Sequence, residues 1–437
     1  MRILSGARRR PAAAAVLAVA ASTLAACGGD SSASGPPTLG FYNNNPVQVT
    51  IANRCAQESR NAYQINPVSL PSSAGGQREQ LLRRLAAGDT TIDVVSLDPP
   101  FMAEFANAGF LRPFTDAERE EFSEGVLEGP LEQAIFDDQM WSAPFYGNTQ
   151  LLWYKKSVAA QAGLDPAAGP VTWDQLIDAA EATGTTLGEQ GIRNESLMVW
   201  VNALVESAGG SIIDPATLTA DAQDVEPAID SEAGAEAARI MSRLGNSSAA
   251  IASFSTANEE DSRAAFQAEN GGFLVNWPYV WSAFDAGIEA GTLPPDFKDD
   301  VAWASFPRVS PDLESAPPSG GIGLSVGAFS NNPDAAVELI RCLRNLEGQK
   351  EYMLAQGDPG AAEALYDDPD IQKQFPMYEA IRDGLNIAVP RTVSPYYGDI
   401  TTGIQRTYHP PGDLSPQVTP AAAAALLRGV LSGSQLL

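Results

Sequence analysis

The sequence predicts an α/β fold divided into two lobes. Strand-like and helix-like segments alternate along the chain, which is the pattern of α/β proteins. The run at residues 92–97, Ile-Asp-Val-Val-Ser-Leu, is mainly apolar, as expected of a parallel strand that is covered on both faces. Cleavage of an N-terminal leader of 26 residues from the 437 would leave 411, too many for one compact core and suited to two lobes.

A secretory leader opens the chain. Four arginines among the first ten residues precede a short apolar stretch at residues 11–26, which is typical of a signal peptide. That stretch is shorter than the roughly 20 residues that a membrane-spanning helix needs. Next, Leu-Ala-Ala-Cys ends at Cys27 and resembles a bacterial lipobox, in which the cysteine carries a lipid. We expect residues 1–26 to be removed and residues 27–37 to form a lipidated, flexible tether; an ordinary leader with an incidental cysteine is the alternative.

The charge of the chain excludes some partners. Lysine and arginine number 27 against 54 acidic residues, which gives a formal net charge of −27. Nucleic acid repels such a chain, and no basic stripe with aromatic residues is present to bind it. The acidity is expected to serve solubility.

Helix starts and strands can be placed in the first part of the chain. Asn45 followed by Pro46 predicts a helix start, because asparagine caps helices and proline suits their first turn. Leucines recur on one side of residues 77–87, which predicts a helix there. The other expected elements are a strand at residues 38–42, the buried strand at 92–97 and a helix at 102–108.

The rest of the chain continues the alternation. Thr172 and Gln175 have the spacing of a capping box, which predicts a helix start. Two glycines at 209 and 210 end the helix expected at residues 199–207. The remaining expected elements are a helix at 262–267, strands at 272–275 and 321–328, a helix from Pro333 and a final alanine-rich helix after the loop at 410–420.

Two cysteines remain besides Cys27. Cys55 and Cys342 each lie on an apolar helix stripe, so both thiols are expected to point inward. An exported protein permits a disulfide between them, and two buried free thiols are the alternative. No cluster of cysteine or histidine indicates a metal or other cofactor, and His409, the only histidine, is expected at the surface.

Polar and aromatic residues follow several expected strands. Ligands of open parallel sheets lie beyond the carboxyl ends of the strands, so these residues are candidates for a site. For Asp98 alone a helix-capping role is the simpler interpretation, because Pro99 begins a new element. The candidates at strand ends are Asn43, Asn44, Asp98, Asn148 and Trp277.

The chemistry of these groups favours an uncharged polyol. Carboxylates and amides bond vicinal hydroxyls in pairs, and charge-assisted bonds are the stronger ones. An indole face covers the C–H surface of a sugar ring; Trp277 suits this role, whereas Trp153 and Trp173 are expected in the core. Glu260 could face a cleft or only stabilise a helix start. Arg391 lies among prolines and aromatics, where an exposed salt bridge is equally expected.

The residues together resemble the extracytoplasmic solute-binding proteins of ABC importers, in the sugar-binding branch. Within it, the likeness to actinobacterial trehalose-binding lipoproteins extends over nearly the whole mature chain. The runs that carry the resemblance include Thr-Trp-Asp-Gln-Leu at 172–176, Asp-Val-Val-Ser-Leu-Asp at 93–98, Asn-Thr-Gln-Leu-Leu-Trp-Tyr at 148–154, Phe-Leu-Val-Asn-Trp-Pro at 273–278 and Arg-Cys-Leu-Arg at 341–344.

The resemblance implies a periplasmic-binding-protein-like fold, in which two hinged α/β lobes close on a ligand in the cleft between them. It assigns residues 38–145 and 277–328 to lobe I and residues 146–276 and 329–437 to lobe II. It also slightly favours a bridge between Cys55 and Cys342. The ligand contacts that we expect on this basis, together with the strand ends, are Asn43, Asn44, Asp98, Asn148, Glu260, Trp277, Gly320, Gly321, Arg391 and Tyr397.

Three departures from that family bear on which sugar is bound. The loop after Tyr42 is compact here, Gly357-Asp358-Pro359 replaces a Gly-Leu-Pro run, and proline precedes Arg391 rather than following it.

The resemblance implies a lipid-tethered receptor that passes trehalose or a related disaccharide, unaltered, to a membrane permease driven by a cytoplasmic ATPase. Closure is expected about a hinge near residues 144–147, 276–278 and 325–330. The alternatives are a receptor for a malto-oligosaccharide or a glycerophosphodiester and, far behind, a surface glycoside hydrolase using Asp98 and Glu260.

Overall fold

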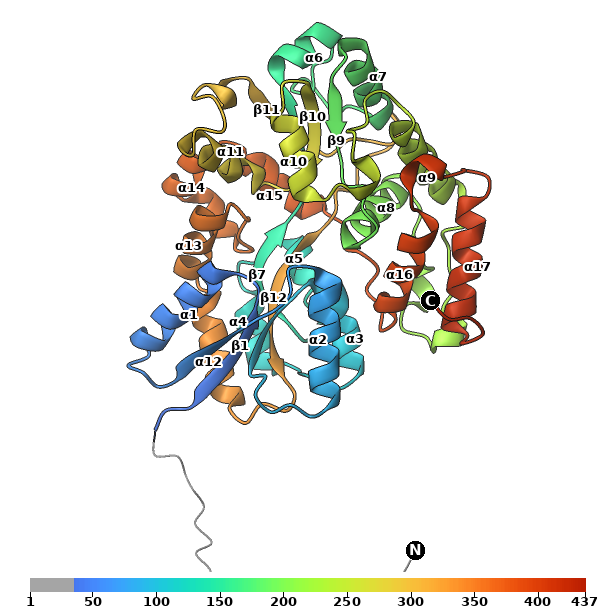
Figure 1. Cartoon of the computed structure of the whole chain (residues 1–437). Helices are drawn as coiled ribbons and strands as arrows, with labels where there is room; N and C mark the ends of the chain where they lie inside the picture. Colours follow the sequence, from blue (N-terminus) through green and yellow to red (C-terminus); the bar gives the residue numbers. More distant parts are fainter. Residues whose placement is uncertain (1–34) are drawn as a thin grey trace, which may run out of the picture. The chain divides into compact units, whose positions relative to one another are not determined.

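Two sheets organise the chain in the computed structural model, which describes residues 35–437 (Figure 1). The leader and the expected lipidation site at Cys27 lie outside the described residues. The first sheet has the order β2 (Gln64–Ser69), β1 (Thr38–Asn43), β3 (Val94–Leu97), β12 (Gly320–Gly327) and β4 (Leu111–Arg112), and β7 (Ala143–Asn148) also pairs with β12. The second has the order β11 (Val301–Ala304), β8 (Leu151–Lys155), β10 (Gly271–Asn276) and β9 (Thr186–Gly188).

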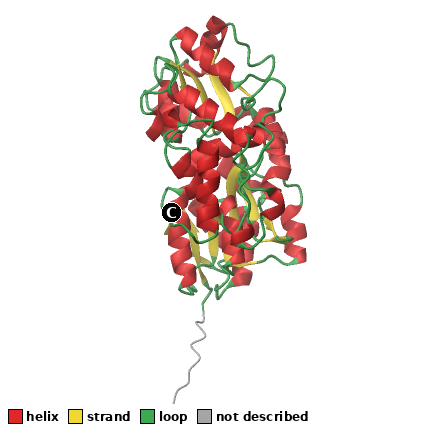
Figure 2. Cartoon of the chain, turned by 90° about the vertical axis from the view of Figure 1, so that its right-hand side faces the viewer, coloured by secondary structure: helices red, strands yellow, loops and turns green. Residues whose placement is uncertain are grey.

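Apolar runs form the interior of both sheets. β3 is buried at every position and pairs in parallel with β1, as its mainly apolar sequence predicts. β10 is likewise buried throughout, between β8 and β9. Helices flank the strands of both sheets (Figure 2), so the mixed α/β class expected from the sequence is confirmed.

Helices α1 (Pro46–Glu58) and α12 (Pro333–Leu343) pack against each other beside the first sheet. The Asn45 side chain accepts a hydrogen bond from the Val47 amide, so the expected cap of α1 is confirmed. Cys55 and Cys342 form a disulfide that joins these two helices, with 5.8 Å between their Cα atoms. The other helices associated with this sheet are α2 (Ala74–Ala86), α3 (Met102–Asn107), α4 (Asp116–Ser123), α5 (Glu128–Glu132) and α13 (Leu346–Gln356).

The expected capping box of α7 (Trp173–Thr183) is confirmed, because Thr172 and Gln175 each bond the other's backbone amide. Trp173 and Trp200 are fully buried and lie 5.6 Å apart in the large core beside the second sheet. The remaining helices are α6 (Lys156–Ala162), α8 (Glu195–Ser207), α9 (Glu232–Gly245), α10 (Glu259–Gln267), α11 (Val280–Glu289), α14 (Pro369–Gln374), α15 (Tyr378–Ile387), α16 (Tyr397–Thr407) and α17 (Thr419–Leu431).

Strand pairing departs from the expected lobe boundaries in two places. Residues 277–328 were expected in lobe I, but β11 pairs with β8, so the chain returns to the first sheet only at β12. Residues 329–437 were expected in lobe II, but α12 and α13 pack on α1. The chain thus crosses between the two sheets at residues 148–151 and 304–320. The expected boundaries missed these crossings because each sheet pairs strands that lie far apart in the sequence.

Within residues 35–437, none of the helices combines the length and apolar character needed to cross a membrane.

Candidate ligand-binding site

A cavity of about 530 Å³ lies where the ends of β3, β7 and β12 face residues following β10 and the start of α8. Its wall brings together residues from both sheets and from α2 and α16. Of the expected site residues, those that line it are Asp98, Asn148, Trp277, Gly320, Gly321 and Arg391.

Trp277 and two glycines form one side of the cavity. The amide of Trp277 donates to Oδ1 of Asn276 at 2.8 Å, which fixes the turn after β10. A Cβ atom on Gly320 would lie 3.1 Å from Cη2 of the Trp277 ring, so glycine lets the indole approach the β12 backbone. Gly321 has φ +121°, and a Cβ there would lie 2.2 Å from the carbonyl oxygen of Tyr146. Position 321 therefore requires glycine, whereas a Cβ at Gly320 would only push the Trp277 ring by a few tenths of an ångström.

Arg391 joins two carboxylates at the other side. Its side chain is only 4% exposed, and its guanidinium bonds both oxygens of Asp98, with Nη2 2.7 Å from Oδ1 and Nη1 3.3 Å from Oδ2. Nη1 also lies 2.7 Å from Oε1 of Glu195. Asp98 follows β3, Glu195 begins α8 and Arg391 precedes α16, so this ion triad ties three distant segments together.

Glu195 is the centre of further hydrogen bonds. Tyr397 donates its hydroxyl to Oε1, and Thr401 donates to Oε2 at 2.8 Å. Burial raises the pKa of Glu195, and Arg391 opposes this effect. Burial lowers the pKa of Arg391, but the charges of Asp98, Tyr397 and Glu195 raise it well above its usual value. The arginine therefore stays charged, facing two carboxyl groups.

Four expected residues do not line the cavity. Asn43 is buried and bonds the backbone of Phe41 and Asn45, while Asn44 is exposed, because the chain turns directly into α1. Tyr397 contributes only through its bond to Glu195. The Glu260 side chain is 59% exposed and pairs with Arg263 on the outer side of α10.

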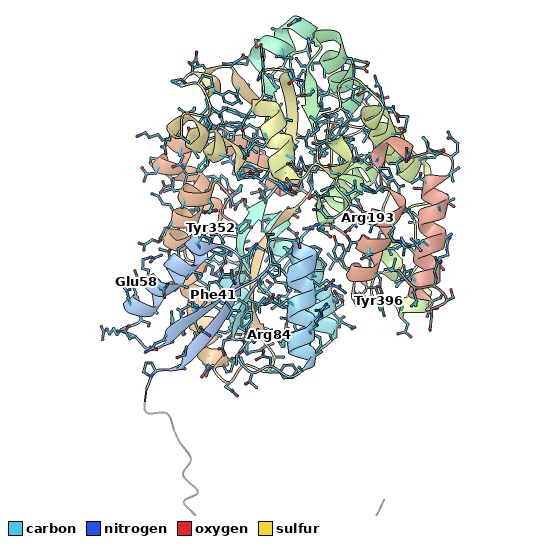
Figure 3. All side chains as sticks on the ribbon, viewed as in Figure 1. Phe41, Glu58, Arg84, Arg193, Tyr352 and Tyr396 are labelled. Carbon is cyan, nitrogen blue, oxygen red and sulfur yellow. A yellow bond between two sulfur atoms is a disulfide. The ribbon has the colours of Figure 1, made fainter. Side chains whose placement is uncertain are left out.

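Sequence reasoning missed several residues that do line the cavity. Glu259, not Glu260, faces it and accepts a hydrogen bond from the Ser196 hydroxyl at 2.7 Å. Arg78, from α2, pairs with Glu104. Arg193, labelled in Figure 3, is exposed just before α8. It lines the cavity and has no ion-pair partner among the described residues. One available signal was Asn194, a helix-capping residue that marks the start of α8 next to Glu195.

Comparison with known proteins decides the family. The profile of the family "Bacterial extracellular solute-binding protein" matches residues 55–350. The chain belongs to this family. The members of this family are solute-binding proteins and not enzymes. The expectation of a binding protein without catalytic activity is thus confirmed.

Individual relatives of this solute-binding protein agree. A "Probable ABC transporter-binding protein" of Deinococcus radiodurans is 28% identical over 265 residues, 57% of this chain and 57% of its own length. The maltose-bound MalE3 protein of T. maritima has a similar structure, with a TM-score of 0.78, 24% identity, and coverage of 90% of this chain and 100% of its own. The GacH receptor of Streptomyces glaucescens, solved unliganded and with acarbose, has a TM-score of 0.75 and 20% identity, covering 91% and 98%. The two-lobed binding-protein fold is thereby confirmed.

Proposed function

We propose that this solute-binding protein is the lipid-anchored receptor of an ABC importer and that it binds trehalose or a closely related disaccharide, which it releases unaltered. One observation carries the proposal: the Trp277 ring lies against the glycine edge of β12, in a cavity that also contains the Asp98–Arg391 pair. A ring face for C–H groups beside paired donors and acceptors is what a sugar requires. The cavity volume falls within the range of about 300–1,000 Å³ for small-molecule sites.

The charges of the wall support an uncharged ligand. Three arginines line the cavity, and two of them are already paired with carboxylates. The four lining carboxylates are Glu79, Asp98, Glu195 and Glu259. Because the two signs nearly cancel, neither an anion nor a cation is strongly favoured.

Two other ligands remain candidates on specific observations. The similar proteins from T. maritima and Streptomyces glaucescens bind maltose and acarbose, which favours a malto-oligosaccharide. Arg193, without an ion-pair partner in the described residues, favours a phosphate group such as that of a glycerophosphodiester. Calorimetry with trehalose, maltose, maltotriose, sucrose, glucose and glycerophosphocholine distinguishes all three.

The proposal places the ligand between two lobes, each built on one sheet. The segments at residues 148–151 and 304–320 would act as the hinge, since they connect the sheets. They replace the segments expected from the sequence, near residues 144–147, 276–278 and 325–330, each of which lies within or directly after a strand of a single sheet. Closure would bring Trp277 toward Asp98 and Asn148 around the sugar.

Membrane attachment and transport partners belong to the same proposal. The lipobox-like sequence ending at Cys27 supports a lipid anchor, and the relative named as an ABC transporter-binding protein supports a permease with a cytoplasmic ATPase. Cys27→Ser should release the protein from the membrane fraction; lipid labelling that persists in this variant would refute the anchor.

Trp277→Ala tests the site itself. Loss of the ring face is expected to weaken sugar binding by about 10- to 100-fold, because an aromatic side chain contributes about 1.5–3 kcal/mol on burial. Trp303→Ala is the matched control: this indole is also partly buried but does not line the cavity. Equal affinity of the Trp277 variant and the wild type would remove Trp277 from the site.

A further inference from the structure

A carboxyl group lies behind the cavity wall, in the Gly357–Pro359 segment that the proposed function does not use. Gly357 ends α13 in the left-handed conformation, with φ +83°, and its amide donates to the carbonyl of Met353 at 2.8 Å. This turn directs the chain toward β7. Asp358, the next residue, is partly buried there and does not itself line the cavity.

Two donors approach the two oxygens of Asp358. Nδ2 of Asn148 lies 3.3 Å from Oδ1, and the hydroxyl of Tyr352 lies 3.3 Å from Oδ2. Asn148 and Tyr146 line the cavity, and the Tyr146 ring stacks on Tyr352 with 5.1 Å between centroids. Asp358 therefore contacts one cavity residue directly and a second through Tyr352, which lies near the start of α1 (Figure 3).

Other bonds fix the direction of both donors. Oδ1 of Asn148 accepts the Thr149 amide at 3.1 Å, so the NH2 group of Asn148 must face Asp358. Oδ1 of Asn45 accepts from Val47, so Nδ2 of Asn45 donates to the Tyr352 oxygen at 3.1 Å. That oxygen is then an acceptor, and its own proton is free to go to Asp358. Both donors thus match an ionised carboxylate.

We propose that Asp358 is a positioning residue of the ligand site: its ionised carboxylate orients the Asn148 amide and the Tyr146–Tyr352 pair, so that protonation of Asp358 weakens ligand binding. The proposal rests on the proposed function, because it takes Asn148 to be a ligand contact. No substrate atom needs to touch Asp358.

Protonation would remove the negative charge of Asp358 and turn one oxygen into an O–H group. The two donors occupy only two of the roughly four acceptor positions of a carboxylate, so both can stay in place, but their bonds lose the charge assistance that orients Asn148 and Tyr352. Burial raises the pKa of Asp358 to about 6, and the bonds from Tyr352 and Asn148 oppose this rise. No cation pairs with Asp358 among the described residues. The change of charge therefore falls near neutral pH.

The groups facing Asp358 do not titrate in this range. They are Tyr352 from α13 and Tyr146 from β7, and burial raises the pKa of both phenols well above the usual value. The negative charge of Asp98, on the cavity side, raises the pKa of Tyr146 further. Glu195, across the cavity, also has a raised pKa, so the contribution of Asp358 must be measured as a difference between variants.

The test is calorimetric titration of the sugar panel at pH values from 5 to 8. A one-proton change with a pKa of about 6 predicts roughly tenfold weaker binding at pH 5 than at pH 7.5 for the wild type. Asp358→Asn should bind more weakly at pH 7.5 and lack this dependence, whereas Asp312→Asn, at an exposed loop carboxylate, should follow the wild type. Asp358→Asn with the wild-type profile would overturn the proposal.

A second variant tests the same interaction while keeping the Asp358 carboxyl group, in case Asp358→Asn does not fold. Tyr352→Phe removes one donor that lowers the pKa of Asp358, so the midpoint of the pH dependence should move upward. A midpoint that stays in place or moves downward would contradict the assigned hydrogen bond.

A measurement without ligand separates this proposal from the proposed function. The side-chain amide resonance of Asn148, followed by NMR in protein labelled with ¹⁵N-asparagine, should titrate near pH 6 in the wild type and not in Asp358→Asn. A wild type that binds no sugar at pH 7.5 refutes the proposed function, while the Asn148 resonance still decides whether Asp358 controls this amide. A resonance that does not move between pH 5 and 8 overturns the positioning role.

Discussion

Replacement of Arg391 by methionine is expected to destabilise the protein strongly. It keeps an unbranched side chain but removes the cation between Asp98 and Glu195, whose side chains are 16% and 14% exposed. Breaking a buried ion pair costs about 3–5 kcal/mol, because the remaining charge is left uncompensated. The folded unit spans Pro37–Leu437, 401 residues, and about 2.1 cal/mol/K per residue gives an unfolding entropy near 0.84 kcal/mol/K. The Tm should therefore fall by about 4–6 °C.

Glu195→Gln is the informative partner variant. The amide oxygen can still accept from Arg391 and Tyr397, and Arg391 keeps both of its bonds to Asp98. Burial already disfavours the ionised form of Glu195, so a neutral side chain costs little there. The expected loss is below about 1 kcal/mol, or about 1 °C in Tm.

Thermal unfolding without ligand, followed by circular dichroism at pH 7.5 and pH 5, measures both effects. Arg391→Met should lose less at pH 5. Arg391 opposes the rise that burial causes in the pKa of Glu195, so without the cation this folded-state pKa rises further above its unfolded value. The stability that depends on neutral Glu195 is then present at low pH and lost as pH rises. Arg428→Met, at an exposed pair 3.7 Å from Glu226, controls for a surface arginine and should change little. An Arg391→Met protein as stable as Glu195→Gln would refute this account of the triad.

Three further outcomes are expected. Gly320→Ala should weaken sugar binding several-fold with little loss of stability, because its Cβ pushes the Trp277 ring by a few tenths of an ångström; calorimetry and Tm together check this. The double variant Cys55→Ser/Cys342→Ser should lose about 2–4 kcal/mol of unfolding free energy in denaturant titrations, as for other disulfides. Burial raises the pKa of Glu206 to about 7, above its unfolded value, so Glu206→Gln should raise stability by up to about 3 kcal/mol at pH 8.5 and leave it unchanged at pH 4.5.

The parts of the site that lie at strand ends could be predicted from sequence. Asp98, Asn148 and Trp277 each follow or end an apolar strand, and a local pattern is enough to find such positions. Glu260 shows the limit of this reasoning. Successive residues of a helix are rotated by about 100°, so neighbours face different directions: Glu259 lines the cavity, while Glu260 is 59% exposed and pairs with Arg263.

The remaining site residues depend on packing between distant segments. Arg78 from α2 and Glu195 from α8 line the cavity together with residues of α16. The hydrophobic periodicity of one helix does not predict which distant helices lie next to it. The strand pairing differs from the expected lobe boundaries for the same reason. β11 is short and only partly buried, and its place beside β8 follows from pairing across more than a hundred residues.

The two polar clusters of the site share one arrangement. Each joins a residue at the end of a first-sheet strand to a side chain from beyond residue 350: Asp98 to Arg391, and Asn148 to Asp358. The first sheet thus supplies groups that face the cavity, and the C-terminal region fixes their orientation. The two carboxylates differ in their partners: the charge of Asp98 is neutralised by the Arg391 cation, whereas Asp358 receives hydrogen bonds only from neutral donors. Arg391 also lines the cavity, whereas Asp358 does not. Substitution of Asp358 should therefore change affinity in a pH-dependent manner without altering the ligand's own contacts.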